Sequence, residues 1–361
     1  MGLPVSRPLA DVPEVDGVLS AQQCLDTASS IARTQHPSGA IPWSTFGHTD
    51  PWDHVESAMA LTAAGLWEPA RAAYDWSRRT QRPDGSWPIQ FRGDVVEDAN
   101  SDSNFCAYIA AGVWHHVLVT GDDAFAELMW PTVRAAIDFV LGLQLPGGEI
   151  AWARSPSGVI PEALLTGSAS VYHSIGCALA LANHLGRTQP EWEVALGALG
   201  HAIVAHPEAF ADKPHHSMEW YYPILGGALR GPDAEARIDG RWGDFVVSGL
   251  GIRCVDDRPW VTGAETCELV LALDALGDRD RALEQFANMQ HLRERDGSYW
   301  TGLVFADGKR WPVERTTWTG AAVVLAADAL SGATGGGGIF RDELPRGLVG
   351  DFDCECVASE R

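Results

Sequence analysis

Four short turn segments recur along this chain, and each follows a stretch with helical periodicity. They read TQHPSGAIPW from residue 34, TQRPDGSWPI from 80, LQLPGGEIAW from 143 and MQHLRERDGSYW from 289. Each joins a glycine to a nearby aromatic residue, a combination typical of a turn that ends one helix and leads into a loop. Recurrence at this spacing predicts a fold built by repeating one supersecondary unit.

Hydrophobic periodicity predicts that the repeated unit is helical, because alternating runs typical of strands are short and few. The expected fold class is all-α, as an (α/α)6 barrel in which six helical hairpins form an inner and an outer ring. The even-numbered segments are the expected inner helices, since several are apolar on every face. Residues 1–330 would form this single domain, and residues 331–361 a Gly-rich and acidic C-terminal extension. About twelve helices are expected, over residues 19–35, 53–65, 68–82, 102–120, 123–144, 168–186, 190–206, 217–230, 233–248, 263–276, 279–293 and 317–331.

The turns that contain Gln81 and Gln290 resemble the QW motif of terpene cyclases and related helical toroids. The resemblance implies a structural role, in which the glutamine caps a helix and the aromatic residue packs beneath it, so that neighbouring outer helices are tied together. It also raises a rival function, a terpenoid cyclase or prenyltransferase-like protein. The aspartates at 122–123 and 256–257 match neither Asp-x-Asp-Asp nor Asp-Asp-x-x-Asp, and clustered Lys and Arg for a diphosphate are missing.

The net charge of -22 excludes several classes of partner. Nucleic acid and anionic membranes are not expected, because binding their phosphates requires clustered basic residues. No run of about 18 apolar residues predicts a membrane span, and the N-terminal segment lacks the apolar core of a leader peptide. The cysteines are scattered, and Cys354 and Cys356 are interpreted as a tail feature. We therefore predict a cytoplasmic protein without metal or cofactor; the sequence does not tell whether the protein has protein partners.

Candidate catalytic residues come from the loops that lead into the inner helices, because such loops converge at one end of a barrel. In the first of these loops, one of Asp50 and Asp53 is the expected catalytic carboxylate, and the other would cap the helix. In the fifth, Glu265 enters an otherwise apolar helix, where burial of a carboxylate is costly without a partner. Glu268, three residues later, is its competitor.

The remaining candidates combine acids, imidazoles and aromatic side chains. Fifteen tryptophans supply flat apolar faces that suit stacking on sugar rings. Two carboxylates in an aromatic cleft favour glycoside hydrolysis of a neutral oligosaccharide or polysaccharide. A sugar epimerase that uses His54, His173 and His216 stays open, as does a glycan-binding protein without catalysis. The expected substrate-binding residues are Trp43, His48, Trp52, Asp53, His54, Asp102, Tyr172, His216, Glu219, Trp220, Tyr221, Trp260 and Trp318.

The chain as a whole resembles the mycobacterial hydrolases of methylmannose polysaccharide, which are often labelled prenyltransferase-like. The segments that carry the resemblance are FGHTDPWDHVESAMAL, QRPDGSWP, HHSMEWYYPILGGAL and PWVTGAETCELVLAL. The resemblance implies an (α/α)6 barrel and cytoplasmic endo-hydrolysis of an α-(1→4) polymer of 3-O-methylmannose. It also implies that Asp50 and Glu265 are the catalytic pair. In such folds the reaction usually inverts the anomeric centre, so we predict inversion, with Asp50 as general acid and Glu265 as general base or the reverse.

Overall fold

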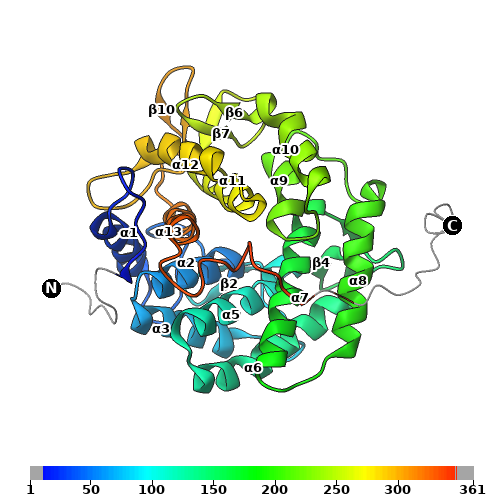
Figure 1. Cartoon of the computed structure of the whole chain (residues 1–361). Helices are drawn as coiled ribbons and strands as arrows, with labels where there is room; N and C mark the ends of the chain where they lie inside the picture. Colours follow the sequence, from blue (N-terminus) through cyan, green and yellow to red (C-terminus); the bar gives the residue numbers. More distant parts are fainter. Residues whose placement is uncertain (1–10, 346, 348–361) are drawn as a thin grey trace.

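Helices account for most of the chain in the computed structural model, which describes residues 11–345 and 347 (Figure 1). The predicted segment 102–120 is divided at Tyr108 into two helices, and the segment 217–230 ends early, before Gly226 and Gly227. Gly227 has a φ of 88°, a conformation that does not continue a helix. The helices are Ala21–Thr34 (α1), Pro51–Ala63 (α2), Trp67–Thr80 (α3), Ser103–Ala107 (α4), Ile109–Thr120 (α5), Asp123–Leu141 (α6), Leu165–His184 (α7), Pro190–Ala205 (α8), Ser217–Leu225 (α9), Pro232–Phe245 (α10), Gly263–Leu276 (α11), Arg279–Asn288 (α12) and Thr317–Ser331 (α13).

Six helices contact one another in a closed cycle that runs α2, α5, α7, α9, α11, α13 and back to α2. Figure 1 shows α1, α3, α6, α8, α10 and α12 lying around this cycle, and each of them packs against one of its members. Every residue of α2 is buried, as is nearly all of α11 and α13. By contrast, α3 buries one face and exposes the arginines of its last turn. The members of the cycle are the even-numbered segments of the prediction.

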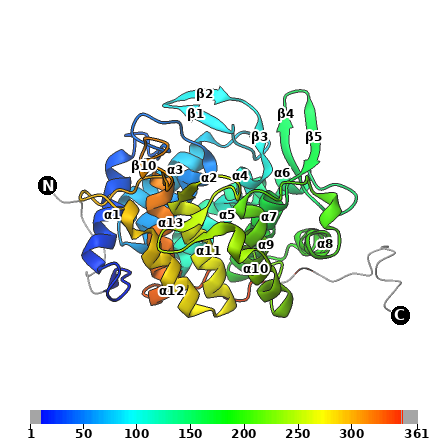
Figure 2. The same cartoon turned by 90° about the horizontal axis from the view of Figure 1, so that it is seen from above.

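Three small antiparallel sheets accompany the helices, so the all-α class is an incomplete description. Their strands are at most six residues long, too short for a strong alternating pattern. Figure 2 shows β1, β2, β4 and β5 standing out from one side of the helical layer. Strands β5 and β8 lead into the inner helices α7 and α11, and β3 leads into α4, which precedes the inner helix α5; we call this side of the ring the mouth. The sheets pair Gln90–Arg92 (β1) with Val95–Asp98 (β2); Ser101–Asp102 (β3), Ala151–Ser155 (β4) and Gly158–Ala163 (β5); and Val246–Val247 (β6), Gly251–Arg253 (β7), Trp260–Thr262 (β8), Gly302–Val304 (β9) and Lys309–Arg310 (β10).

The repeated turns tie neighbouring outer helices together, which confirms their predicted structural role. Gln81, the residue after α3, donates from Nε2 to the Gly85 carbonyl of its own turn and to the Thr132 carbonyl of α6, both at 2.9 Å. Gln35 and Gln144 repeat this pair of hydrogen bonds with the next outer helix along the ring. Each turn glycine fits closely against the neighbouring helix backbone, where a Cβ would overlap a carbonyl group.

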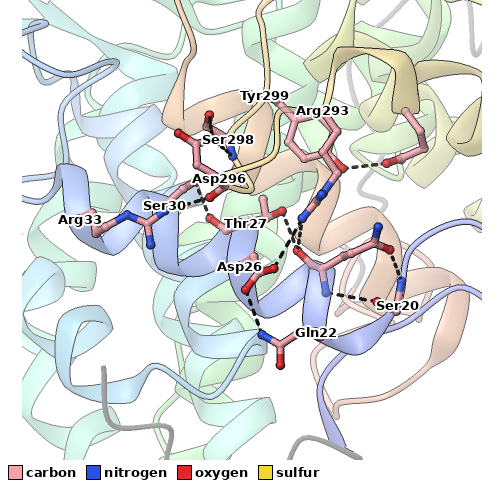
Figure 3. Close-up of polar contacts among 12 residues, drawn as sticks. Ser20, Gln22, Asp26, Thr27, Ser30, Arg33, Arg293, Asp296, Ser298 and Tyr299 are labelled. Carbon is pink, nitrogen blue, oxygen red and sulfur yellow. Dashed lines mark hydrogen bonds and ion pairs between the residues drawn. The ribbon is translucent and has the colours of Figure 1, made fainter. Parts of the chain in front are cut away.

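In the fourth turn, Arg293 takes the place of the glutamine, so the prediction that Gln290 does so is wrong. Arg293 stands four residues before Gly297, as Gln81 does before Gly85, and its Nη2 donates to the Gln23 carbonyl of α1 at 3.3 Å. Figure 3 shows this contact beside Asp296, whose carbonyl accepts from Arg33. Gln290 instead accepts a hydrogen bond from the Tyr299 hydroxyl. A guanidinium has the reach and the donors to replace a side-chain amide here.

The segment after α13 crosses the C-terminal ends of the inner helices, opposite the mouth (Figure 1). The Phe340 ring stacks on His173 of α7, with centroids 4.7 Å apart, and the Phe340 carbonyl accepts from Arg230. Arg341 forms an ion pair with Asp274 of α11 at 2.7 Å.

Residues 346 and 348–361 of the predicted extension, including Cys354 and Cys356, lie outside the described residues. None of the helices described is long and apolar enough to cross a membrane.

Candidate active site

Asp50 lies at the mouth, where it caps the first turn of α2. Its Oδ1 accepts hydrogen bonds from the backbone N–H groups of Trp52 and Asp53, at 3.0 and 2.9 Å. The other oxygen, Oδ2, is buried and accepts no hydrogen bond from the described residues. His48 Nε2 is 3.9 Å from it. Capping therefore holds Oδ1 in place, while Oδ2 is available to contact a substrate.

Asp53 lies beside Asp50 and is also buried. Burial raises the pKa of Asp53 well above its usual range, and the negative charge of Asp50 raises it further. An acid in this position keeps its proton near neutral pH, because two adjacent carboxylates resist ionising together. The sequence left open whether Asp50 or Asp53 is the catalytic carboxylate, and the structure places the two carboxyl groups side by side.

Glu265 and Glu268 project from the first turns of α11, and both are buried. Burial raises the pKa of Glu265. Burial also raises the pKa of Glu268 to about 8, although the hydroxyls of Tyr221 and Tyr222 donate to its two oxygens and oppose the shift. Both oxygens of Glu268 are engaged by tyrosines of α9, whereas Glu265 at the mouth has hydrogen bonds with Thr262 and Cys254, which lower its pKa against the effect of burial.

Glu56, one turn along α2 from Asp53, belongs to the site although it is not among the predicted catalytic or substrate-binding residues. Its pKa is raised by burial and then by the charge of Glu268. Tyr108 donates to Glu56 Oε2 at 3.4 Å. Glu56, Glu268, Tyr108 and Tyr222 line a cavity of about 10 Å³, room for about one water molecule. The signal that could have found Glu56 is a carboxylate in a helix that is otherwise apolar.

Asp102 joins the acidic group from a third direction, as the N-cap of α4. Its Oδ1 accepts from the Phe105 N–H at 3.1 Å. Burial raises the pKa of Asp102 to about 7 against the effect of its backbone hydrogen bonds, and the charge of Asp50 adds to the shift. Carboxyl groups from α2, α4 and α11 therefore raise one another's pKa values across the mouth.

Aromatic rings form a continuous wall beside these carboxyl groups. Trp43 stacks on His48 with ring centroids 5.9 Å apart and lies 5.6 Å from Trp318. Trp318 meets the edge of Trp52, which stacks on Tyr108 at 4.7 Å. Trp43, His48, Trp52 and Trp318 were all predicted substrate-binding residues. Such a wall can hold sugar rings by their apolar faces.

Several buried polar atoms at the mouth have no hydrogen-bond partner among the described residues. Buried polar groups are rarely left so, and a polar ligand is a suitable partner for them. They come from the N-terminal parts of α2, α4, α7, α9 and α13, which is where a substrate with many hydroxyl groups would meet them. They are Asp50 Oδ2, Trp52 Nε1, Asn104 Oδ1, Ser168 Oγ, Ser217 Oγ and Trp318 Nε1.

The structure gives His54 a role in packing and does not bring it to the mouth. His54 Nδ1 accepts from the Ile41 N–H and Nε2 donates to the Ala73 carbonyl, both at 3.0 Å. Complete burial lowers its pKa to about 4, so the ring stays neutral. His54 thereby joins the first loop to α3.

Four further predicted residues lie away from the carboxyl groups. Trp220 stacks on Phe245 and donates to the Arg237 carbonyl of α10. Its neighbour Glu219 accepts from the backbone and the hydroxyl of Thr166. Tyr172 borders a separate cavity at the opposite end of the ring, and Trp260 packs against Trp311 at the outer sheet.

His216 is exposed at the N-cap of α9, and its backbone forms a bridge with Val255. Tyr221, by contrast, joins the site through Glu268. Within residues 11–345 and 347, no group of three or more His, Cys, Asp or Glu residues is placed to hold a metal ion.

Comparison with known proteins gives close and remote similarities. No family model matches the chain. The chain is 74% identical over 351 residues to the MMP endo-(1,4)-3-O-methyl-α-D-mannosidase of Mycolicibacterium hassiacum, which covers 97% of this chain and 98% of that protein. Among solved structures, a wild-type glycosidase is 15% identical with a TM-score of 0.66, over 87% of this chain and 97% of its own. A D-mannose isomerase is 11% identical with a TM-score of 0.66, over 85% and 95%. At these identities the two solved structures show a shared fold.

Proposed function

Because the chain belongs to the family of MMP endo-(1,4)-3-O-methyl-α-D-mannosidases and is a glycoside hydrolase, we propose that it cleaves internal α-(1→4) linkages in a polysaccharide of 3-O-methylmannose. The observation that carries the proposal is the 74% identity across nearly the whole of both chains. A neutral polymer also suits a protein with a net charge of -22, which would repel an anionic one.

We propose that the closed cycle of inner helices and the outer helices around it form an (α/α)6 barrel over residues 1–330. Residues 331–361 would be an extension of that domain. The proposed location is the cytoplasm, since the described cysteines, Cys24, Cys106, Cys177, Cys254 and Cys267, are all free thiols.

In the proposed mechanism, Asp50 and Glu265 act on opposite sides of the scissile bond. Helices α2 and α11 pack against α13 from either side of it in the cycle, so the two carboxyl groups come from different helices of the ring. The proposed reaction is inversion, which requires carboxyl groups about 6.5 to 9.5 Å apart to leave room for a water molecule. Glu265, whose pKa is raised by burial, would take a proton from this water as general base.

As the water oxygen bonds to the anomeric carbon and the glycosidic bond breaks, Asp50 would protonate the leaving oxygen as general acid, through its Oδ2. The wall of Trp43, Trp52 and Trp318 would hold the methylated rings.

The experiment that tests the proposal incubates wild type, Asp50→Asn and Glu265→Gln with 3-O-methylmannose polysaccharide and follows chain length by mass spectrometry. The wild type is expected to release shorter methylated oligosaccharides, and each variant to lose about 10²- to 10⁴-fold in rate. NMR of the first product would report inversion. Asp94→Asn, in the turn between β1 and β2, is the control and should act like the wild type. An intact polymer with the wild type would contradict hydrolysis and favour a glycan-binding protein.

Of the three histidines that the epimerase alternative would use, His54, His173 and His216, the structure engages the first two in packing. His54 is held by two backbone hydrogen bonds. His173 is covered by Phe340, and burial lowers its pKa to about 3. Neither ring is placed to move a proton at the mouth. The aspartates of the cyclase alternative are also engaged, since Asp256 pairs with Arg241 and Asp122 caps α6.

A further inference from the structure

Large apolar side chains that are exposed to solvent concentrate at the mouth. The nine that are described include six in loops and hairpins that precede inner helices, and three on outer helices, namely Leu128, Val194 and Val204. Single exposed apolar residues need no explanation, but a concentration at one place indicates a binding surface. The six at the mouth are Phe46, Val95, Val96, Val159, Trp311 and Val313.

Phe46 is the most exposed of them, at 94%, although its loop is firmly held. Trp43 N–H donates to the His48 carbonyl and Gly47 N–H to the Ser44 carbonyl, both at 2.7 Å, which closes the loop on itself. Arg92 of β1 donates to the Phe46 carbonyl at 3.0 Å. A fixed backbone that presents an aromatic ring to solvent is suited to contact with a ligand.

The backbone of Phe46 has a φ of 68°, a left-handed conformation that glycine or asparagine adopts more readily. The conformation of the turn therefore gives no reason for a phenylalanine at position 46. Strained residues of this kind concentrate at binding and active sites, where the surrounding contacts hold them.

The loop of Phe46 is continuous with the wall of the active site and with a second apolar loop. Trp43, at its base, donates from Nε1 to Glu314 at 2.9 Å. Ser44 and Thr45 share a surface depression with Val313 and Glu314. Val313 is 82% exposed, and Trp311, two residues earlier, is 53% exposed. We call Phe46, Trp311 and Val313 the apolar rim.

We propose that the apolar rim is a subsite for sugar units remote from the cleaved bond, with Phe46 as the residue that senses their methyl ethers. This inference rests on the proposed function. A chain cut internally extends beyond the mouth on both sides, so its outer units must cross the rim. A methyl ether removes a hydrogen-bond donor and adds apolar area, and an exposed aromatic face gains contact with such a group.

Remote contacts of this kind raise the rate for long substrates, because binding energy far from the reacting bond helps to orient and distort the substrate at the reacting centre.

The test measures kcat/KM of wild type, Phe46→Ala and Phe46→Trp on 3-O-methylmannose oligosaccharides of increasing length and on unmethylated (1→4)-linked mannose oligomers. Leu128→Ala, which removes a 56% exposed side chain from α6, is the matched control.

With Phe46→Ala, the ratio of kcat/KM between the longest and the shortest methylated oligosaccharide is expected to fall about tenfold. The corresponding ratio for unmethylated oligomers should change less than about twofold. Phe46→Trp should keep the wild-type ratio, and so should Leu128→Ala.

An equal loss at all lengths would overturn the inference, because it would mean that Phe46 only shapes the loop before Asp50. An unchanged ratio would overturn it as well. A wild type that leaves every oligosaccharide intact would instead contradict the proposed function and the inference together.

Discussion

At the scale of single residues, the site depends on carboxyl groups that burial keeps partly protonated. Asp53, Glu56, Asp102, Glu265 and Glu268 all have raised pKa values, and burial is the largest cause in each case. Neighbouring negative charges raise the pKa further at Asp53, Glu56, Asp102 and Glu268, because ionising one group makes it harder to ionise the next. An acidic cluster of this density can exist inside a fold only if part of it remains neutral.

Glu268 should make the stability of the protein depend on pH. Its pKa in the folded state is about 8, above the ordinary value of 4.5, so the folded protein holds a proton that the unfolded chain releases. The stabilisation is complete below about pH 4.5 and is lost as the pH rises toward 8. Urea unfolding of Glu268→Gln should show a shallower pH dependence over this window, by up to about 1.4 kcal/mol per pH unit.

Glu284→Gln, an exposed change on α12, is the control for this experiment and should keep the wild-type slope. Equal slopes for Glu268→Gln and the wild type would contradict a proton held on Glu268.

His54 should affect stability and leave the chemistry intact. The His54→Ala variant loses two hydrogen bonds to buried backbone groups and opens a cavity, so the free energy of unfolding should fall by about 3 kcal/mol. The folded fraction is expected to hydrolyse the polymer at close to the wild-type rate. His36→Ala, at an exposed position, serves as the control in denaturant unfolding. A stable but inactive His54→Ala would contradict a role in packing alone and mean that His54 takes part in the chemistry.

At the scale of elements, the repeated turns are the joints between outer helices. Gly85 has a φ of 90° and lies against the Ala135 carbonyl of α6, while Gln81 bridges to the same helix. The turn thus requires glycine for its conformation and for the close approach. Gly297 and Arg293 repeat the arrangement against α1.

Gly85→Ala should therefore be far more destabilising than Gly93→Ala. Gly93 also has a positive φ, of 57°, but a Cβ there meets no atom within 4 Å. We expect about 1 kcal/mol of lost stability at Gly93, from the backbone alone. At Gly85 the overlap with the backbone of α6 should raise the loss of stability to about 3 kcal/mol. Thermal unfolding of both variants measures the difference, and equal losses would show that the contact with α6 does not matter.

At the scale of the whole molecule, the segment after α13 supports the site from the opposite end of the ring. Phe340 covers His173 and lines the small cavity with Glu56 and Glu268. It is held there by Arg230, and the next residue, Arg341, pairs with Asp274. The environment of the buried acids thus depends on a part of the chain about 70 residues beyond Glu268.

Phe340→Ala should lower the free energy of unfolding by about 3 kcal/mol, since it removes a buried ring. Water entering from this end would also reduce the burial of Glu268 and bring its pKa down from about 8. The loss of stability with rising pH should still begin near pH 4.5, but it should end at a lower pH and be smaller in total than in the wild type. Unfolding curves at several pH values measure both effects, and a variant with an unchanged pH profile would mean that Phe340 does not seal the cavity.

The sequence by itself determined most of the helical segments, the turns that join them and a helix cap at Asp50 or Asp53. These features depend on interactions within a few residues, so local pattern is enough to predict them. The resemblance of whole segments pointed to the family, which the 74% identity then showed. Short strands such as β3 were not predictable in this way, because their pairing depends on distant segments.

Only the tertiary structure decided which polar residues of the inner helices meet. Helix α2 is buried on every face, so hydrophobic periodicity carries no information on which of Asp53, His54 and Glu56 faces its neighbours in the ring. The packing of α2 against α5 and α13 fixes that rotation, and with it the approach of Glu56 to Glu268, 212 residues away. The same holds for Trp220 and Tyr221, adjacent residues of which one packs against α10 and the other binds Glu268. The rotation of a fully buried helix about its own axis is set by the helices that pack against it. It therefore cannot be predicted from the local sequence of that helix.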